Sequence, residues 1–553
     1  MRKGVTWLKP LKRVLVALIA ALSLVATAVP AGAQGEPISY ESEKKAAQRN
    51  SSSMYNVVDQ INARSLWQQG ITGEGIDVAV IDTGVAPVPA LTGADKVVAM
   101  VDLSFEAGIP EATFLDTYGH GSHMAGIIAG SDPGGDPATA HERPKEFHGV
   151  APGAGIVSVK VGDNTGAVDV SQVIAAIDWV IEHKDEGDLN IRVINLSYGT
   201  DSTQDPEIDP LSHAVERAWH AGIVVVVAAG NGGKDGVGLS NPASNPYVIA
   251  VGAAKVKNNG SVTVPGWSAR AWKVNKSNRD WLKAWDADYK KRGADLVAPG
   301  DSIRSLRVPG SRIGMEETAG RVNETIQRGT GTSQATAVVS GAAALLLQAR
   351  PDLTPDQVKA LLMDSADSID GARANRQGAG LIDVGAAAAM ATPDAVQNWT
   401  RSTGTGSLDA ARGSARVVIH GEELVGETTV TGADWDADAW LEAAGSTWTG
   451  STWTGSTWTG STWTGSTWTG STWTGSTWTG STWTGSTWTG STWTGSTWTG
   501  STWTGSTWTG STWTGSSWTG STWTGSTWTG STWTGSTWTG STWTNQGWHG
   551  SFG

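Results

Sequence analysis

The chain of 553 residues contains no cysteine, so no disulfide bond stabilises it and its stability must come from a buried core. It is also poor in basic residues, with 39 Lys and Arg against 52 Asp and Glu and a formal net charge of −13 at pH 7. Such acidity argues against a nucleic-acid partner. Charge is absent from the last part of the sequence, because no Asp, Glu, Lys or Arg follows Glu442. That part therefore lacks the charge repulsion that keeps a segment extended.

The first 33 residues combine a basic start, an apolar run and small residues. Five Lys and Arg precede the apolar run at 14–29, and Ala31-Gly32-Ala33 follows it. This pattern predicts a secretory signal peptide at residues 1–33, cleaved after Ala33. A membrane anchor is disfavoured because about 16 apolar residues fall short of the roughly 20 that span a bilayer. We therefore expect no transmembrane anchor after cleavage.

Three motifs present an acid, a base and a nucleophile in the order Asp, His, Ser. Asp82 lies in Val-Ile-Asp-Thr-Gly, His120 in Gly-His-Gly-Ser-His, and Ser333 in Gly-Thr-Gly-Thr-Ser-Gln-Ala-Thr. A serine hydroxyl is a poor nucleophile until an imidazole accepts its proton, which predicts Ser333 as nucleophile and His120 as base. Asp82 would be the buried carboxylate on the other ring nitrogen. Asn231, after the apolar run 223–227, is predicted to donate to the oxyanion together with the Ser333 backbone N–H.

These motifs, with supporting phrases in the same order across residues 76–389, resemble those of the subtilisin-like serine proteases, the subtilases. The resemblance implies an endopeptidase that acts on polypeptide substrates. It also implies a pocket for the side chain before the scissile bond, walled by Ser197, Tyr198, Gly199, Ala228, Ala229 and Gly230. Structural calcium is allowed by the same resemblance, but no ligand loop is specific enough to name, and we identify no metal ligand or other cofactor.

Each motif taken singly has a plain structural interpretation, such as a strand-end carboxylate or a surface turn. Their conjunction and order favour catalysis, and the absence of a Gly-x-Ser-x-Gly elbow disfavours a lipase or esterase. His123 is assigned to structure, since a triad needs one base, and not to a metal site. Gln334 and Ala337 stand where many subtilases carry Met and Pro. Neither position carries the proton transfer, and Gln334 could contact substrate or a neighbouring loop.

Short apolar runs alternate with helical stretches along the central part of the chain. The runs lie at residues 76–82, 97–103, 156–161, 193–197, 223–229 and 248–253. This alternation predicts an α/β fold in which helices flank a parallel sheet. Met124, Ile127 and Ile128 follow His120 at helical spacing, and residues 338–347 predict a buried helix behind Ser333. The dipole of that helix would favour negative charge at its start.

The composition divides the chain into five predicted segments. These are the signal peptide (1–33), a leader (34–52), a subtilisin-like peptidase domain (53–392), a linker or small β module (393–444) and a repeat tail (445–553). The peptidase domain is long enough to bury one large core. Residues 34–75 are too few for a separately folded domain, so we expect no folded inhibitory prodomain and a short detachable leader at 36–50. Residues 393–444 suit either a β module or a tether.

The low-complexity tail repeats Gly-Ser-Thr-Trp-Thr and places tryptophan at every fifth position from Trp448 to Trp543. A period of five fits neither one helix nor one long strand. Thr-Trp-Thr favours strand and Gly-Ser favours a turn, so the tail is predicted to be β-repetitive, with one short strand and one corner per repeat. The alternative is a flexible, sticky tail. The rings would either contact a polysaccharide such as a cell wall or pack on each other as a spacer.

The sequence therefore predicts a secreted serine endopeptidase, extracellular or cell-wall associated, that works through an acyl-enzyme on Ser333. The alternative belongs to another class of protein. It is a cell-surface adhesion or structural protein in which the repeat tail is the active part and the protease domain is a scaffold. Intact Asp82, His120, Asn231 and Ser333 argue against that alternative.

Overall fold

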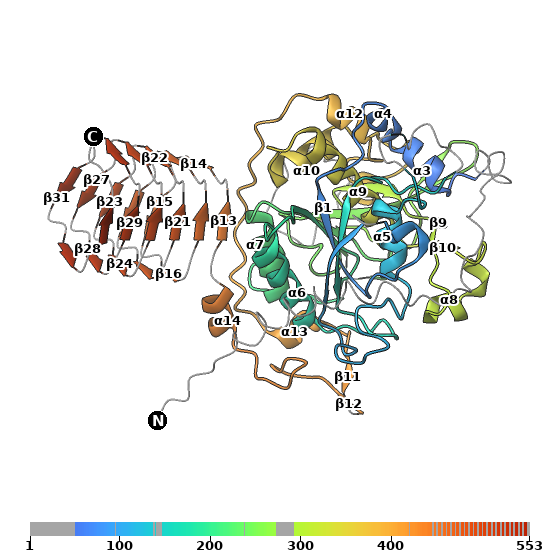
Figure 1. Cartoon of the computed structure of the whole chain (residues 1–553), viewed down its shortest axis with the longest axis horizontal. Coiled ribbons are helices and arrows are strands. Elements are labelled where there is room, and N and C mark those ends of the chain that lie inside the picture. The colour runs from blue at the N-terminus through green and yellow to red at the C-terminus, as the bar shows by residue number, and fades with distance from the viewer. Residues whose placement is uncertain are drawn as a thin grey trace.

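The computed structural model describes residues 50–93, 96–135, 139, 146–236, 238–271, 292–419 and 421–444, together with three-residue strands between residues 447 and 549. The predicted signal peptide and most of the predicted leader lie outside these residues. Figure 1 shows an α/β body with the strands of the C-terminal repeat to one side. Within the described part of the chain, no helix is both long enough and apolar enough to cross a membrane.

An eight-stranded sheet forms the centre of the body. Its order is β2 (Val97–Asp102), β3 (Gly155–Lys160), β1 (Asp77–Asp82), β4 (Ile191–Leu196), β5 (Val224–Ala228), β6 (Ile249–Val256) and β7 (Val262–Thr263), and β8 (Leu296–Pro299) also pairs with β6. The strands are parallel, except that β7 is antiparallel to β6. The six predicted apolar runs coincide with β1 to β6, which confirms the predicted sheet.

Helices cover both faces of this sheet, which is why β1, β3 and β5 are buried along their whole length. Helices α5 (Gly121–Ala129) and α9 (Thr332–Ala349) pack together on one face, and α6 (Val170–His183) and α7 (Pro210–His220) pack on the other (Figure 1). All of α5 is buried, and so is nearly all of α9. The predicted buried helix is confirmed, and Ser333 lies in its first turn.

Shorter elements complete the body and its C-terminal extension. They are α3 (Met54–Gln60), α4 (Arg64–Trp67), η2 (Pro89–Leu91), β9 (Ile303–Leu306), α8 (Arg312–Glu316), η5 (Thr318–Gly320), β10 (Ile326–Gly329), α10 (Pro355–Asp364), α11 (Ala374–Gln377), α12 (Val384–Ala389), α13 (Leu408–Arg412), β11 (Val418–Ile419), β12 (Glu422–Glu423) and α14 (Ala437–Ala444).

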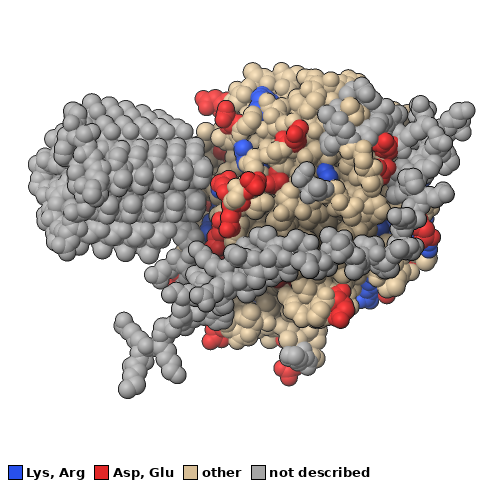
Figure 2. All heavy atoms as spheres, viewed as in Figure 1, with Lys and Arg blue, Asp and Glu red and all other residues tan. Residues whose placement is uncertain are grey.

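Acidic side chains are scattered over the face of the body in Figure 2, in keeping with the acidic composition.

Residues 393–444 lie against the body. On α13, Leu408 and Ala411 are fully buried within the main core. Trp440 donates from Nε1 to Oδ2 of Asp178 on α6 (2.8 Å) and meets His213 of α7 edge to face, with ring centroids 5.4 Å apart. The β structure described in this segment consists of the two-residue pair of β11 and β12 and an isolated bridge between Thr428 and Asp434. The segment therefore packs as an extension of the body, while the predicted domain boundaries stay predictions.

The tail is described by its backbone strands, β13 (Thr447–Thr449) to β33 (Gly547–His549), with one strand at each Thr-Trp-Thr, Ser-Trp-Thr or Gly-Trp-His. Neighbouring strands of each sheet are parallel and lie 20 residues apart in the sequence, as Trp448 and Trp468 do. The result is four sheets, each with one tryptophan per strand in register. What the tail contacts stays a prediction.

Candidate active site

Asp82 and His120 meet at the edge of the sheet where the parallel strands end. Asp82 is the last residue of β1, and His120 immediately precedes α5. Nδ1 of His120 lies 2.8 Å from Oδ1 and 3.0 Å from Oδ2 of Asp82. The Asp82 side chain is 4% exposed and the His120 side chain 24% exposed. The carboxylate is thus buried behind a ring whose other nitrogen lies nearer to solvent.

The charge around His120 favours its protonated form. Burial alone would lower the pKa of the imidazole, but the charge and hydrogen bond of Asp82, with the charge of Asp116, outweigh it, so the pKa of His120 is raised above its ordinary value. A raised pKa makes the ring a better proton acceptor.

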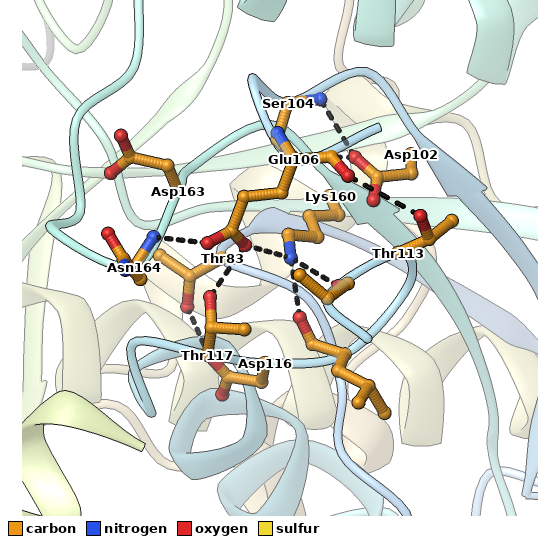
Figure 3. Close-up of polar contacts among 12 residues, drawn as sticks. Thr83, Asp102, Ser104, Glu106, Thr113, Asp116, Thr117, Lys160, Asp163 and Asn164 are labelled. Atoms are coloured by element: carbon orange, nitrogen blue, oxygen red, sulfur yellow. Dashed lines mark hydrogen bonds and ion pairs between the residues drawn. The ribbon is translucent and has the colours of Figure 1, made fainter. Parts of the chain in front are cut away.

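Asp116 was not singled out in the sequence, yet it joins the elements that carry Asp82 and His120. Its buried carboxylate accepts hydrogen bonds from the Thr83 hydroxyl (2.7 Å; Figure 3), Gly119 N (2.6 Å) and Ser122 N (2.7 Å). Desolvation raises the pKa of Asp116, while these hydrogen bonds act to lower it. The sequence offered one indication that Asp116 belongs to the site, its position four residues before His120. An aspartate at such a position is also common in surface turns, so the indication was not specific.

The second histidine of the motif has a different environment. His123 is buried in α5, and its Nδ1 lies 3.2 Å from the carbonyl oxygen of Leu306. Desolvation, followed by the nearby His120, lowers the pKa of His123 to about 4. A neutral ring held by a backbone carbonyl fits the predicted structural role.

Ser333 lies in the first turn of α9 and is partly exposed. Its hydroxyl reaches the carbonyl oxygen of Ser197 at 3.5 Å, and the Ser197 hydroxyl donates to the carbonyl oxygen of Ser333 at 3.2 Å. Within the described part of the chain Ser333 makes no hydrogen bond to His120. Such contacts are often long or poorly aligned in the absence of substrate.

Asn231 is fixed by the residue that precedes Ser333. Its Oδ1 accepts from the backbone N–H of Thr332 (2.9 Å) and from the Thr332 hydroxyl (3.1 Å), which in turn accepts from Gly230 N (3.1 Å). Its Nδ2 makes no hydrogen bond among the described residues. The amide is therefore oriented with its donor end available beside the start of α9.

The two predicted pocket walls approach each other closely. Ser197, Tyr198 and Gly199 follow β4, and Ala228, Ala229 and Gly230 end or follow β5, its neighbour in the sheet. A Cβ on Gly199 would lie 2.7 Å from Cβ of Ser240, and one on Gly230 would overlap the Ser240 hydroxyl. Only glycine fits at these two positions. The Tyr198 hydroxyl is buried and has no hydrogen-bond partner among the described residues, so this side chain turns its polar end into the protein.

Gln334, one of the two departures from the usual subtilase pattern, is 5% exposed. Its side-chain amide lies beside Gly329 and Gly331, where Cβ atoms would collide with it. Of the two contacts that the sequence left open, the structure shows the one with a neighbouring loop.

The loop that leads to His120 is organised around a buried ammonium. Nζ of Lys160, at the end of β3, is fully buried and contacts Oε2 of Glu106 (2.5 Å) and the carbonyl oxygens of Ala112 (3.0 Å) and Leu115 (2.6 Å) (Figure 3). Thr117 also donates to Oε2 of Glu106 (2.7 Å). The ammonium thus ties the loop to the sheet from within.

This loop does not fit a calcium ion. The carboxylates of Asp102, Glu106 and Asp116 already accept from backbone N–H groups, hydroxyls and Lys160. No group of three or more His, Asp or Glu in the described part of the chain is arranged to hold a metal.

The chain is similar to several known proteins. A family model for the subtilase family matches residues 73–380. Serine protease AprX of Bacillus subtilis (strain 168) is 36% identical over 321 residues, covering 57% of this chain and 66% of AprX. Subtilisin of Bacillus pumilus is 34% identical over 342 residues, covering 60% of this chain and 97% of that protein. Fervidolysin from Fervidobacterium pennivorans, a keratinolytic enzyme related to subtilisin, aligns with a TM-score of 0.47 and 27% identity over 63% of this chain and 48% of that one.

The family match covers more than half of the chain and contains every predicted site residue. The chain spans nearly all of the Bacillus pumilus subtilisin and somewhat less than two thirds of AprX. Residues 393–553 lie beyond the family match. On these grounds the chain belongs to the subtilase family of serine endopeptidases.

Proposed function

We propose that the protein is a secreted endopeptidase that cleaves polypeptides through an acyl-enzyme on Ser333. The observation that carries the proposal is the 2.8 Å contact between Nδ1 of His120 and a buried Asp82. That contact presents Nε2 of the ring as the proton acceptor, and Ser333 follows at the start of a buried helix. The mechanism requires the Ser333 hydroxyl to leave the carbonyl oxygen of Ser197 and turn toward His120 when substrate binds.

The reaction then follows from these groups. His120 takes the proton of Ser333 as Oγ bonds to the substrate carbonyl carbon, and Asp82 stabilises the imidazolium. Nδ2 of Asn231 and the backbone N–H of Ser333 donate to the oxyanion, and the positive end of the α9 dipole adds to that field. His120 returns the proton to the leaving amine as the C–N bond breaks. Water, deprotonated by the same ring, hydrolyses the acyl-enzyme.

The walls formed by residues 197–199 and 228–230 take the side chain before the scissile bond. Alanine and glycine line much of them, which leaves room for an apolar side chain. Specificity is therefore broad or apolar-leaning.

The experiment that tests this function compares casein hydrolysis by the wild type, Ser333→Ala and Ser340→Ala. Ser340 lies on the same helix and is buried, with its hydroxyl 3.0 Å from Oδ1 of Asn195. Ser333→Ala should lower kcat by roughly 10⁶-fold, the order found for nucleophile removal in a subtilisin. Ser340→Ala should keep activity within about tenfold. Equal rates for the wild type and Ser333→Ala would reject the proposal.

Export and the tail form a second part of the proposal. The basic and apolar pattern of residues 1–33 supports secretion, with the mature chain starting at Gln34 unless the leader is also removed. The tryptophan array supports contact with a cell-wall polysaccharide. Sedimentation with insoluble peptidoglycan, chitin and cellulose would compare the full chain with a chain ending at Ala444. Equal recovery of the two would remove the binding role from the tail.

A further inference from the structure

The loop that follows the first pocket wall is held along its length by a segment beyond the family match. This loop comprises residues 200–209, and the segment, here named the C-terminal clamp, comprises residues 402–416. The hydrogen bonds that join them include Thr403 N to Glu207 O (2.7 Å), Gly406 N to Ile208 O (2.6 Å), Ser407 N to Gln204 Oε1 (2.9 Å), Thr200 Oγ1 to Ala411 O (2.7 Å) and Ser414 N to Asp201 Oδ1 (2.6 Å). Backbone and side chains both take part, so the contact between the loop and the clamp is continuous.

Arg412 anchors the clamp. Its side chain is fully buried, with Nε 2.6 Å from Oδ2 of Asp169, the N-cap of α6. Its other donors reach the carbonyl oxygens of Gly426 (2.7 Å) and Thr428 (2.5 Å). A buried guanidinium needs all of its partners, so this part of the clamp has one favourable position. Gly413 follows with φ of 59°, and a Cβ there would overlap Asp201 and Ser202. The clamp and the loop are in direct backbone contact.

Tyr198 connects this anchor with the pocket. It lies between Ser197, which is hydrogen-bonded to Ser333, and Thr200, which is hydrogen-bonded to Ala411. Its hydroxyl is buried, and desolvation and the charge of Asp169 raise its pKa, while the charge of Arg412 opposes them. The backbone of the first wall is thus held on both sides of Tyr198, by Ser333 and by the clamp.

The second pocket wall is also connected to the clamped loop. Thr200 and Asn241 exchange both of their backbone hydrogen bonds (2.9 and 3.0 Å), and Ser240 N donates to Ala229 O (3.0 Å). The Asn241 side chain donates to both carboxylate oxygens of Asp209 (3.1 Å each) at the end of the clamped loop. A displacement of the clamp would therefore reach both walls through Thr200.

We propose that the C-terminal clamp sets the width of the substrate pocket, so that Thr200 and Arg412 are positioning residues for specificity. The proposal rests on the proposed function, because it concerns the pocket of the same active site. It assigns to residues outside 73–380 a part in choosing the side chain before the scissile bond.

The test uses the full chain as wild type, Thr200→Val, Arg412→Met and the control Arg416→Met. Arg416 pairs with Asp409 inside the clamp, and its side chain is 22% exposed, so its loss should leave the loop in place. Peptides that differ only in the residue before the scissile bond (Ala, Leu, Phe or Glu) report on the pocket. The rate of labelling by a small fluorophosphonate reports on the triad and not on the pocket, because the probe carries no such side chain.

Thr200→Val should lower kcat/KM for the preferred peptide by about three- to tenfold, the scale of one lost hydrogen bond, mostly through KM. It should also flatten the preference among the four peptides and leave the labelling rate within about twofold. Arg412→Met should lower kcat/KM and flatten the preference more strongly than Thr200→Val. Arg416→Met should change neither kcat/KM nor the preference. An unchanged preference profile in Thr200→Val would overturn the proposal, as would parallel losses of labelling and peptide hydrolysis.

Hydrogen exchange separates failure of the clamp from failure of the proposed function. Thr200→Val should speed backbone exchange across residues 200–209 relative to the wild type and Arg416→Met, whether or not the protein hydrolyses peptides. Unchanged exchange there would reject the clamp even if the enzyme is active. If the wild type showed neither labelling nor hydrolysis, the proposed function would be rejected. Faster exchange in Thr200→Val would then show that the clamp stabilises the loop without a role in specificity.

Discussion

The base and the nucleophile of this site are held by different physical means. The loop before His120 is fixed by buried charges and hydrogen bonds, with Asp116 and Lys160 at its centre. The helix that carries Ser333 is fixed by small apolar residues, and Gly341 lets it approach Val150 so closely that an added Cβ would lie 2.6 Å from the Val150 Cβ. The loop before His120 is the polar half of the site, and its stability depends on ion pairs and hydrogen bonds and therefore on protonation. The helix that carries Ser333 is the apolar half, and its stability depends on the shapes of the packed side chains.

The two halves of the site therefore tolerate different substitutions. A buried charge that loses its partner costs several kcal/mol, and its loss changes the electrostatics around the base. A helix packed through alanine and glycine loses stability when a side chain grows, but its charges stay the same. The same activity can thus be damaged by two routes with separate signatures.

Asp82→Asn attacks the polar half directly and should have the largest effect. The amide cannot stabilise an imidazolium and favours the wrong tautomer of His120, so kcat should fall by roughly 10⁴-fold. Steady-state kinetics on a peptide substrate measures this, with the exposed Asp59→Asn as control. A loss below tenfold would remove Asp82 from the triad.

Lys160→Met tests the buried ammonium. It leaves the Glu106 carboxylate buried without its cation, so unfolding free energy should fall by about 3–5 kcal/mol in urea denaturation. The double variant Lys160→Met/Glu106→Gln should recover part of that loss, because the unpaired charge is gone. If the single variant were as stable as the wild type, the loop would not depend on this pair.

Gly341→Ala tests the apolar half. Its new methyl group would press on Val150, so unfolding free energy should fall by about 1–3 kcal/mol. The pH profile of kcat/KM per folded molecule should match that of the wild type, because no charge has changed. A shifted profile would show that the two halves are not separable.

Asp116→Asn should have the smallest effect on rate and a distinct effect on pH dependence. The groups that act on the charge of His120 are Asp82, Asp116 and the neutral His123. Removing the Asp116 charge lowers the pKa of His120. Because the reaction needs the neutral ring, the acid limb of the kcat/KM profile should move to lower pH. Asp102→Asn, in the same loop, is the matched control, and an identical shift in both variants would contradict the assignment.

The sequence predicted the sheet, and it named the residues that we propose for the reaction. Apolar runs mark β1 to β6, and Asp82 and Asn231 fall near strand ends, where parallel sheets gather their sites. Sequence could not find Asp116 or Lys160, because a charged side chain looks the same in a chain whether it ends up solvated or buried. Arg412 was missed for the same reason, in a stretch that suited a tether. The pocket role predicted for Tyr198 took no account of which way its hydroxyl would turn.

The most direct test of the central claim, an assembled triad, is labelling with a fluorophosphonate followed by mass-spectrometric mapping. Folded and heat-denatured protein would be compared, because the serine reacts only when His120 and Asp82 are in place. The account predicts a single label, on Ser333, that disappears on denaturation. No label in the folded protein, or a label on another serine, would contradict it.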